Sequence, residues 1–150
     1  MKAPSTTLVL DAAILVAAAR GRSSGAVLTA AKAASLVTTD RVIEEARRRI
    51  EFGLKRPDLL HVIDALAEEL TIVPVVALTP ILARSETALR EAVPSRNGST
   101  RDAHVLALAW CVDADVWTSD RDFAGTGVAT WSTPNLMRGL ARAEVDERRG

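Results

Sequence analysis

The chain has 150 residues, of which 48% are hydrophobic and 25% are charged, and its 19 basic and 19 acidic residues give a formal net charge of zero. These values are typical of one globular domain with its own core and exclude a disordered chain. They also exclude an overall positive field that would draw the protein onto nucleic acid or a membrane, so any polyanion site must be local. We expect a single domain over residues 1–150, with a charged tail over about residues 143–150 that has the composition of a flexible segment.

The cysteine content and the N-terminal residues indicate in which cellular compartment the protein is expected. The single cysteine, Cys111, excludes an internal disulfide, and together with two histidines it falls short of the usual structural zinc site. Asp11 interrupts the apolar N-terminal stretch, and no run reaches the roughly 18 apolar residues of a transmembrane helix. We therefore expect a cytoplasmic protein without a signal peptide and without a membrane partner.

The first half of the chain alternates short apolar runs with helical patterns. It predicts, in order, a strand over Thr6–Leu10, helices over Ala12–Ala19 and Gly25–Ala34, a strand over Leu36–Thr38, and helices over residues 41–54 and 57–69. The first strand lacks polar alternation, as expected of a strand that is covered on both faces. Asp40 is the predicted N-cap of the helix over residues 41–54, and Gly53 predicts the end of that helix.

The second half continues the alternation. It predicts a strand over Thr71–Val76, helices over residues 80–92 and 101–111, strands over Ala114–Thr118 and Gly127–Trp131, and a last helix from Pro134. Pro74 removes a ladder donor and so places the third strand at an edge of the sheet. The helix over residues 101–111 is apolar nearly all round and is predicted to be buried. The whole pattern predicts an α/β protein, a three-layer α/β/α sandwich around a central, mostly parallel sheet.

Acidic residues stand where predicted strands end. Asp11 ends the first strand, and Asp120 and Asp122 follow the fourth. Ligand sites of parallel sheets form outside the carboxyl ends of the strands, especially where the strand order reverses. Glu45 and Asp102, from neighbouring helices, are placed to converge on the same crevice. We interpret these carboxylates as a candidate site.

Each of these acids also has a purely structural explanation. The explanations are an N-cap for Asp11, a solvated helix face for Glu44 and Glu45, the helix dipole for Asp102, and turn chemistry for Asp120 and Asp122. Taken singly, each explanation is the better one. Taken together, these structural explanations give no reason why acidic residues should follow neighbouring strands. This joint pattern favours a ligand-binding or catalytic site.

Three segments resemble PIN-domain nucleases, the family that includes the VapC toxins of bacterial toxin–antitoxin pairs. "LVLDAAILVAAA" at residues 8–19 resembles the family's opening strand that ends in Asp. "LVTTDRVIEEA" at residues 36–46 resembles its strand-to-helix step with an inward Glu, and "RDAHVLALAWCVDADVWTSDRDF" at residues 101–123 its Asp-led helix and Thr-x-Asp strand end. The order and spacing agree over most of the chain.

The resemblance implies a site of four carboxylates with a fifth nearby. Its members are Asp11, Glu45, Asp102 and Asp120, with Asp122 as the fifth. Thr118 would orient a carboxylate or the scissile phosphate. Oxygen ligands of this kind favour Mg²⁺ or Mn²⁺ over zinc, and close carboxylates repel one another unless a cation or proton lies between them.

Some positions depart from the family pattern or stay open. Glu45 is favoured over Glu44 because it lies nearer the apolar stripe of its helix. Ala13 stands where the family usually has Asn or Ser. A glycine that is common before the fourth strand is absent, and Asp113 and Asp115 in that stretch are interpreted as turn residues.

Basic residues and a histidine near the acids are weighed separately. Arg96, Arg101 and Arg121 flank the acidic segments and are candidates for contacts to phosphate, or equally for surface charges. The run at residues 47–49 wraps around its helix and is not expected to form one patch. His104 is interpreted as a core or helix-start residue and not as a general acid.

The resemblance implies a metal-dependent endoribonuclease acting on single-stranded or loop RNA. It implies the toxin of a toxin–antitoxin pair, with an antitoxin encoded nearby and a homodimeric state. The alternatives are a catalytically silent PIN-fold module that binds RNA or protein, and a housekeeping RNA-processing nuclease. A phosphatase or a receiver on another doubly wound fold is a further alternative, although a haloacid-dehalogenase phosphatase would need Asp where Ala13 stands.

Overall fold

Five parallel strands form the central sheet of the computed structural model, which describes residues 3–22, 24–92, 101–119, 123 and 125–150. The strands are β1 (Thr7–Leu10), β2 (Ser35–Thr39), β3 (Thr71–Val73), β4 (Asp115–Trp117) and β5 (Thr130–Trp131). Their order across the sheet is β3-β2-β1-β4-β5, and all neighbouring pairs are parallel. The predicted α/β class is confirmed, and β3, which Pro74 follows, lies at an edge as predicted.

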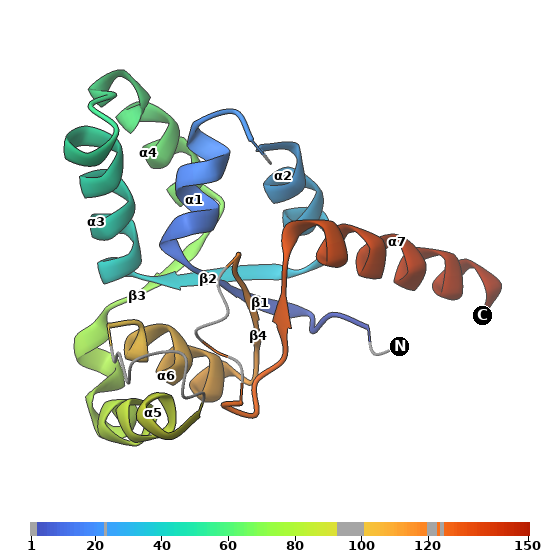
Figure 1. Cartoon of the computed structure of the whole chain (residues 1–150). Coiled ribbons are helices and arrows are strands. Elements are labelled where there is room, and N and C mark those ends of the chain that lie inside the picture. Colours follow the sequence, from blue (N-terminus) through green and yellow to red (C-terminus); the bar gives the residue numbers. More distant parts are fainter. Residues whose placement is uncertain (1–2, 23, 93–100, 120–122, 124) are drawn as a thin grey trace.

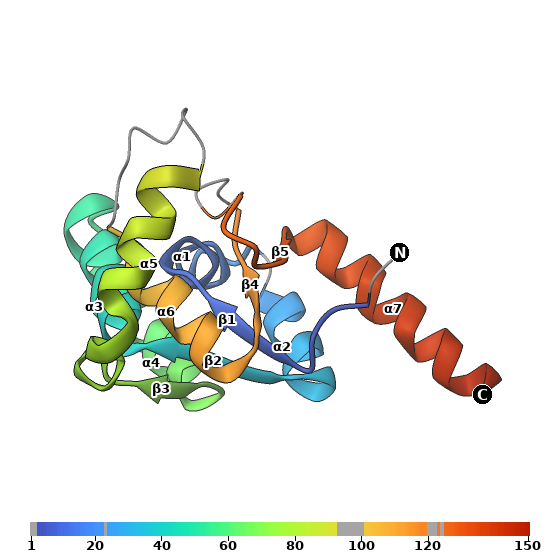
Figure 2. The same ribbon diagram turned by 90° about the horizontal axis from the view of Figure 1, so that it is seen from below.

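Helices cover both faces of this sheet, as Figures 1 and 2 show. Those of the described residues are α1 (Ala12–Ala19), α2 (Ser24–Ala33), α3 (Asp40–Arg48), α4 (Leu60–Glu68), α5 (Thr79–Ala92), α6 (Ala103–Val112) and α7 (Thr133–Arg149), with the short helical turns η1 (Arg49–Gly53), η2 (Pro57–Leu59) and η3 (Val75–Leu78). Helices α1 to α4 lie on one face and α5 and α6 on the other. The three-layer sandwich is therefore confirmed.

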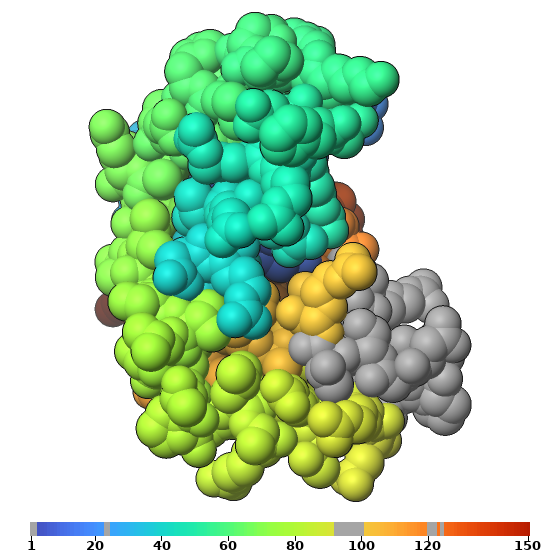
Figure 3. All heavy atoms as spheres, turned by 90° about the vertical axis from the view of Figure 1, so that its left-hand side faces the viewer, coloured from blue at the N-terminus to red at the C-terminus, as the bar shows by residue number. Residues whose placement is uncertain are grey.

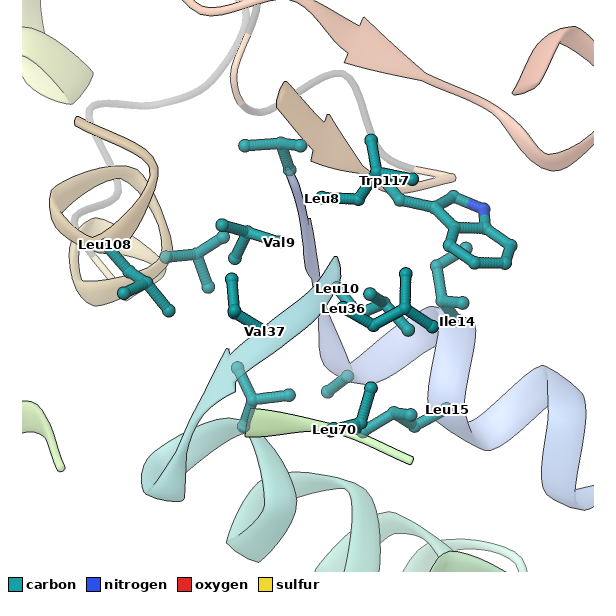
Figure 4. Close-up of a cluster of buried hydrophobic side chains, with 14 of the residues drawn as sticks. Leu8, Val9, Leu10, Ile14, Leu15, Leu36, Val37, Leu70, Leu108 and Trp117 are labelled. Carbon is teal, nitrogen blue, oxygen red and sulfur yellow. The ribbon is translucent and has the colours of Figure 1, made fainter. Parts of the chain in front are cut away.

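The core follows from strands that are apolar on both faces. Val9 of β1 is in register with Val37 of β2, and both side chains lie on the side of the sheet toward Leu108 of α6 (Figure 4). Leu10 lies on the other side of the sheet, where Ile14 of α1 also lies. Because successive side chains of a strand point to opposite faces, a strand without polar alternation fills both cores at once.

The start of α3 differs from the prediction. Thr39, and not Asp40, is the N-cap, and its hydroxyl accepts a hydrogen bond from the backbone N–H of Val42 at 3.1 Å. The Asp40 carboxylate instead accepts from the N–H of Val75, at 2.9 Å. Threonine and aspartate both cap helices well, so the choice between them depends on a residue 35 positions away.

Asp115 corrects a second prediction. It lies inside β4 and not in a turn, and it is 7% exposed. Its Oδ2 accepts hydrogen bonds from the backbone N–H of Ser5 and from Nε1 of Trp131, both at 2.9 Å. Asp113 does lie in a turn, with a φ of 53°. Asp115 thus ties the N-terminal segment and β5 to the centre of the sheet.

The last helix, α7, includes the charged residues 143–149 and packs on α2. Gly139 lies where α7 crosses the N-terminal segment, and a Cβ there would come within 2.9 Å of a Pro4 side-chain carbon and 3.2 Å of Trp131. Glycine is therefore required by close packing at this crossing. Across the described ranges, no helix is both long and apolar enough to span a membrane.

Candidate active site

Asp11 and Thr118 meet at the carboxyl ends of β1 and β4. These strands are neighbours in the sheet although β2 and β3 separate them along the chain, so the strand order reverses between them. The backbone N–H of Asp11 donates to the carbonyl oxygen of Trp117 at 3.3 Å, which continues the pairing one residue past the strands. The two residues therefore stand at the topological switch point where parallel sheets form ligand sites.

The Asp11 carboxylate is buried and has two roles. Its Oδ1 accepts from the backbone N–H of Ile14 at 3.1 Å, so Asp11 is the N-cap of α1. Its Oδ2 accepts a hydrogen bond from the hydroxyl of Thr118. Asp11 is 7% exposed and Thr118 is 3% exposed. Donors on both oxygens satisfy this carboxylate in its interior position.

Glu45 lies on the inward side of α3. Its side chain is 22% exposed, whereas that of Glu44 is 66% exposed. Glu45 Oε1 forms an ion pair with Nη2 of Arg49 one turn later, at 3.0 Å, and Glu44 pairs in the same i, i+4 pattern with Arg48. The difference in exposure favours Glu45 as the residue that faces the site, because it lies on the flank of the helix that carries the buried Val42 and Ala46.

Asp102 stands immediately before α6, at its N-cap position. Its carbonyl oxygen accepts from the N–H of Val105 at 3.0 Å, and no side-chain cap hydrogen bond is present between Asp102 and the described residues of the helix. The prediction placed Asp102 in the first turn of a helix that begins at Arg101, whereas the helix begins at Ala103. The side chain is half-buried and lies where α6 begins on the opposite face of the sheet from α3.

A hollow of about 690 Å³ lies between α3 and the start of α6. Figure 3 shows the N-terminal part of the chain, in dark blue, at the bottom of the depression between these two helices. The described residues that line the hollow are Arg41, Glu44, Glu45, Arg48, Arg49, Phe52, Gly53, Arg101 and His104. Its volume is that of an ordinary small-molecule site.

The structure describes three of the four predicted carboxylates, since Asp120 and Asp122 lie outside the described residues, as do Arg96 and Arg121. Within the described ranges, no group of three or more His, Cys, Asp or Glu side chains is arranged to hold a metal ion. The four-carboxylate site therefore stays a prediction. The structure brings Asp11 together with Thr118, and it places Glu45 in the lining of the hollow.

The oxygen donors of the candidate site are of the chemical type that binds a hard divalent cation. Asp11, Glu45 and Asp102 offer carboxylate oxygens and Thr118 a hydroxyl, and the lining residues that the structure describes include no cysteine and one histidine. Oxygen donors of this type suit Mg²⁺ and Mn²⁺.

His104 is part of the core, as predicted. It is 2% exposed, and its Nδ1 lies 2.8 Å from the hydroxyl of Thr39. Burial lowers the pKa of His104 to about 4, with the charge of Arg41 acting in the same direction and that of Asp40 opposing it. The neutral imidazole with its proton on Nε2 satisfies this contact, because the Thr39 hydroxyl then donates to Nδ1.

Sequence reasoning named Arg101 of the hollow as a candidate, but it missed Arg41 and Phe52 and did not expect Arg48 and Arg49 to lie there together. Arg47 pairs with Asp64 of α4, whereas Arg48 and Arg49 line the hollow. The helical wheel separates these positions, but it assumes a regular helix. Here the turn after Arg48 widens into the π-helix η1. The available signal was Gly53, which marked the end of the helix without revealing the wider turn.

The sheet order and the buried acid at its switch point define a doubly wound α/β protein with an acidic candidate site at the strand ends. A sequence model of the PIN domain matches residues 9–141, and the chain belongs to the PIN domain family, whose members are nucleases. No curated protein matches the chain.

The fold is similar to that of a chain in the crystal structure of VapBC2 from Rickettsia felis bound to a DNA fragment from their promoter. The TM-score is 0.66 at 16% sequence identity, and the match covers 84% of this chain and 98% of that chain. At this identity the similarity establishes the fold.

Proposed function

We propose that this chain is a metal-dependent endoribonuclease that hydrolyses phosphodiester bonds of single-stranded or loop RNA. The observation that carries the proposal is the buried Asp11 carboxylate, held by Thr118 at the switch point of the sheet in a PIN-domain chain. Asp11, Glu45, Asp102 and Asp120 are the proposed ligands of Mg²⁺ or Mn²⁺, with Asp122 nearby.

In the proposed reaction the bound cation and the residues around Asp11 would have different roles. A divalent cation held by these carboxylates would lower the pKa of water and would neutralise the negative charge that develops at the phosphate. Thr118 fixes the orientation of the Asp11 carboxylate through its hydrogen bond. The N-cap bond from Ile14 fixes the other oxygen of the same carboxylate. The acid is thereby positioned before any ligand arrives, which lowers the cost of ordering it on binding.

We also propose that the nuclease is the toxin of a toxin–antitoxin pair, acting in the cytoplasm as a homodimer. The similarity in fold to a VapBC2 chain supports this assignment. A short reading frame directly upstream that encodes a small DNA-binding protein is the expected companion. Its absence, with no growth arrest on expression, would favour a housekeeping RNA-processing nuclease.

The test is cleavage of a panel of single-stranded and structured RNAs by purified protein in Mg²⁺, Mn²⁺ or EDTA. We expect cleavage in either metal and none in EDTA. Asp11→Asn is the matched variant, because asparagine caps helices as well as aspartate does but carries no charge. It should keep the N-cap of α1 and fold, as circular dichroism would check, while losing cleavage and growth arrest. Cleavage that persists in Asp11→Asn, or binding of RNA without cleavage in any metal, would contradict the proposal, and the second result would indicate a silent binding module.

A further inference from the structure

Phe52 exposes an aromatic ring at the hollow between α3 and α6. Its exposed fraction is 69%, whereas that of Phe123 is 1%, and these are the only two phenylalanines in the sequence. The ring lines the same hollow as Glu45. A large apolar side chain left in water beside a candidate active site is more informative than a buried one, because packing gives no reason for it.

The backbone holds the ring in this position. Phe52 belongs to η1, a single π-helical turn closed by a hydrogen bond from the N–H of Leu54 to the carbonyl of Arg49, at 2.8 Å. Ile50 of the same turn is fully buried and anchors it in the core. Single π turns within helices are rare and occur frequently at functional sites. The ring is thus carried on an anchored turn and not on a free loop.

Positive charge surrounds the ring. The described lining includes four arginines against two glutamates, and both glutamates already pair with arginines of their own helix. The Arg41 guanidinium has no ion pair with any described residue. An anionic ligand with a flat apolar portion matches both features, because guanidinium groups bind phosphate and aromatic rings stack on bases.

We propose that the hollow is the subsite for one unpaired nucleotide of the RNA substrate, with its base stacked on Phe52 and its phosphate held by Arg41. The proposal rests on the proposed nuclease function and adds the residues that select an unpaired base. Stacking requires a base outside a duplex, so Phe52 would favour single strands and loops over paired RNA. A simple anion would not need the ring, and a purely apolar partner would not need the arginines.

The test uses a short single-stranded RNA that carries the fluorescent base 2-aminopurine at successive positions, titrated with the full chain in EDTA so that no cleavage occurs. We expect strong quenching at one position with the wild-type protein, because stacking quenches this base. Phe52→Ala should abolish the quenching and weaken RNA binding about tenfold, in line with the usual contribution of one stacked base. Phe52→Trp should retain both.

Two further variants separate stacking from general effects. Phe52→Leu keeps an apolar side chain without an aromatic face and should lose the quenching as Phe52→Ala does. Leu28→Ala removes an apolar side chain that is 55% exposed on α2, outside the lining of the hollow, and should change neither quenching nor affinity. Because Phe52 is exposed, each of its variants is expected to fold, and circular dichroism checks this.

Several outcomes would overturn the proposal. They are equal quenching in wild type and Phe52→Ala, no RNA binding by the wild type in this assay, and loss of binding to a coexpressed antitoxin in Phe52→Ala without loss of RNA binding. The last would place a protein segment in the hollow. Failure of the nuclease function is distinguished by wild-type protein that cleaves no RNA in Mg²⁺ or Mn²⁺ yet still quenches 2-aminopurine through Phe52.

Discussion

At the residue scale, the site depends on a carboxylate whose two oxygens serve different parts of the molecule. Asp11 caps α1 with one oxygen and receives the Thr118 hydroxyl with the other. The capping explanation and the active-site explanation of this residue are therefore compatible. Helix capping is a reason to place acid after β1, and the contact with Thr118 turns the same acid toward β4.

Replacing Thr118 with valine should expose the second of these roles. Thr118→Val keeps the shape of the side chain but removes the donor to a buried carboxylate, so we expect a loss of about 1.5–3 kcal/mol in the free energy of unfolding. RNA cleavage should fall as well. Thr118→Ser keeps the hydroxyl and is the control. Urea denaturation of both variants, with a cleavage assay, measures the two effects, and a Thr118→Val protein as active as the wild type would remove Thr118 from the site.

At the scale of elements, helix α3 and the π turn η1 supply most of the described residues that line the hollow. Two i, i+4 pairs line the hollow, and they differ in how far their acid is shielded: Glu45, which pairs with Arg49, is 22% exposed, whereas Glu44, which pairs with Arg48, is 66% exposed. The two pairs have the same chemistry and spacing but differ in exposure. Variants of the two pairs can therefore be compared to separate an effect on the candidate metal site from a general effect of charge on the protein.

Arg49 should compete with a cation for Glu45. Arg49→Gln removes this competitor, so we expect Mn²⁺ to bind about two- to threefold more tightly, as the modest strength of i, i+4 pairs allows. Arg48→Gln removes the same charge beside Glu44 and should change the Mn²⁺ affinity less. Calorimetric titration of the RNA-free protein measures both. Equal changes in the two variants would mean that Glu45 takes no special part in metal binding.

The elements themselves were largely predictable, because apolar runs and helical periodicity report local burial. The helix Ala12–Ala19 has the predicted bounds. The resemblance to PIN-domain nucleases implied that Thr118 would orient a carboxylate or the scissile phosphate, and in the structure the Thr118 hydroxyl donates to Asp11. The details that failed depend on distant partners. Thr39 caps α3 because the Asp40 carboxylate accepts a hydrogen bond from the N–H of Val75 instead. Asp115 is buried because its carboxylate accepts hydrogen bonds from Ser5 and Trp131, which are distant in the sequence.

The site was less predictable than the fold for a related reason. Carboxylates at strand ends are visible in a sequence, but an exposed ring such as Phe52 looks like any core phenylalanine. Its orientation follows from the widened turn η1, which periodicity does not reveal. Helix α6 shows the same limit, since its apolar pattern predicted burial throughout, yet Trp110 and Val112 at its end are 36% and 40% exposed.

At the scale of the whole molecule, His104 links the two layers of helices through the sheet. It lies in α6 and contacts Thr39, the N-cap of α3 on the other face. Its imidazole is buried in the neutral form. Protonation of His104 therefore acts on the folded state as a whole and not on one helix.

Lowering the pH should destabilise the fold through this residue. The pKa of His104 falls from 6.5 to about 4 on folding, so between these values the unfolded chain binds more protons. The free energy of unfolding should thus fall as the pH drops from 7 to 5, by about 2 kcal/mol, and the loss should continue toward pH 4. Urea denaturation at several pH values measures this. His104→Gln should remove most of the dependence between pH 7 and pH 5, and an unchanged pH profile in that variant would assign it to other groups.

The distance in sequence between Asp11 and Thr118 also affects how the protein is made. These residues lie 107 positions apart and meet only when β4 has paired with β1. During synthesis β1 leaves the ribosome well before β4, because β2, β3 and the helices α1 to α6 lie between them along the chain. If the chain cuts RNA, it therefore gains that activity only after β4 has been translated and has paired with β1, so a nascent chain that stops short of Thr118 should not cleave RNA.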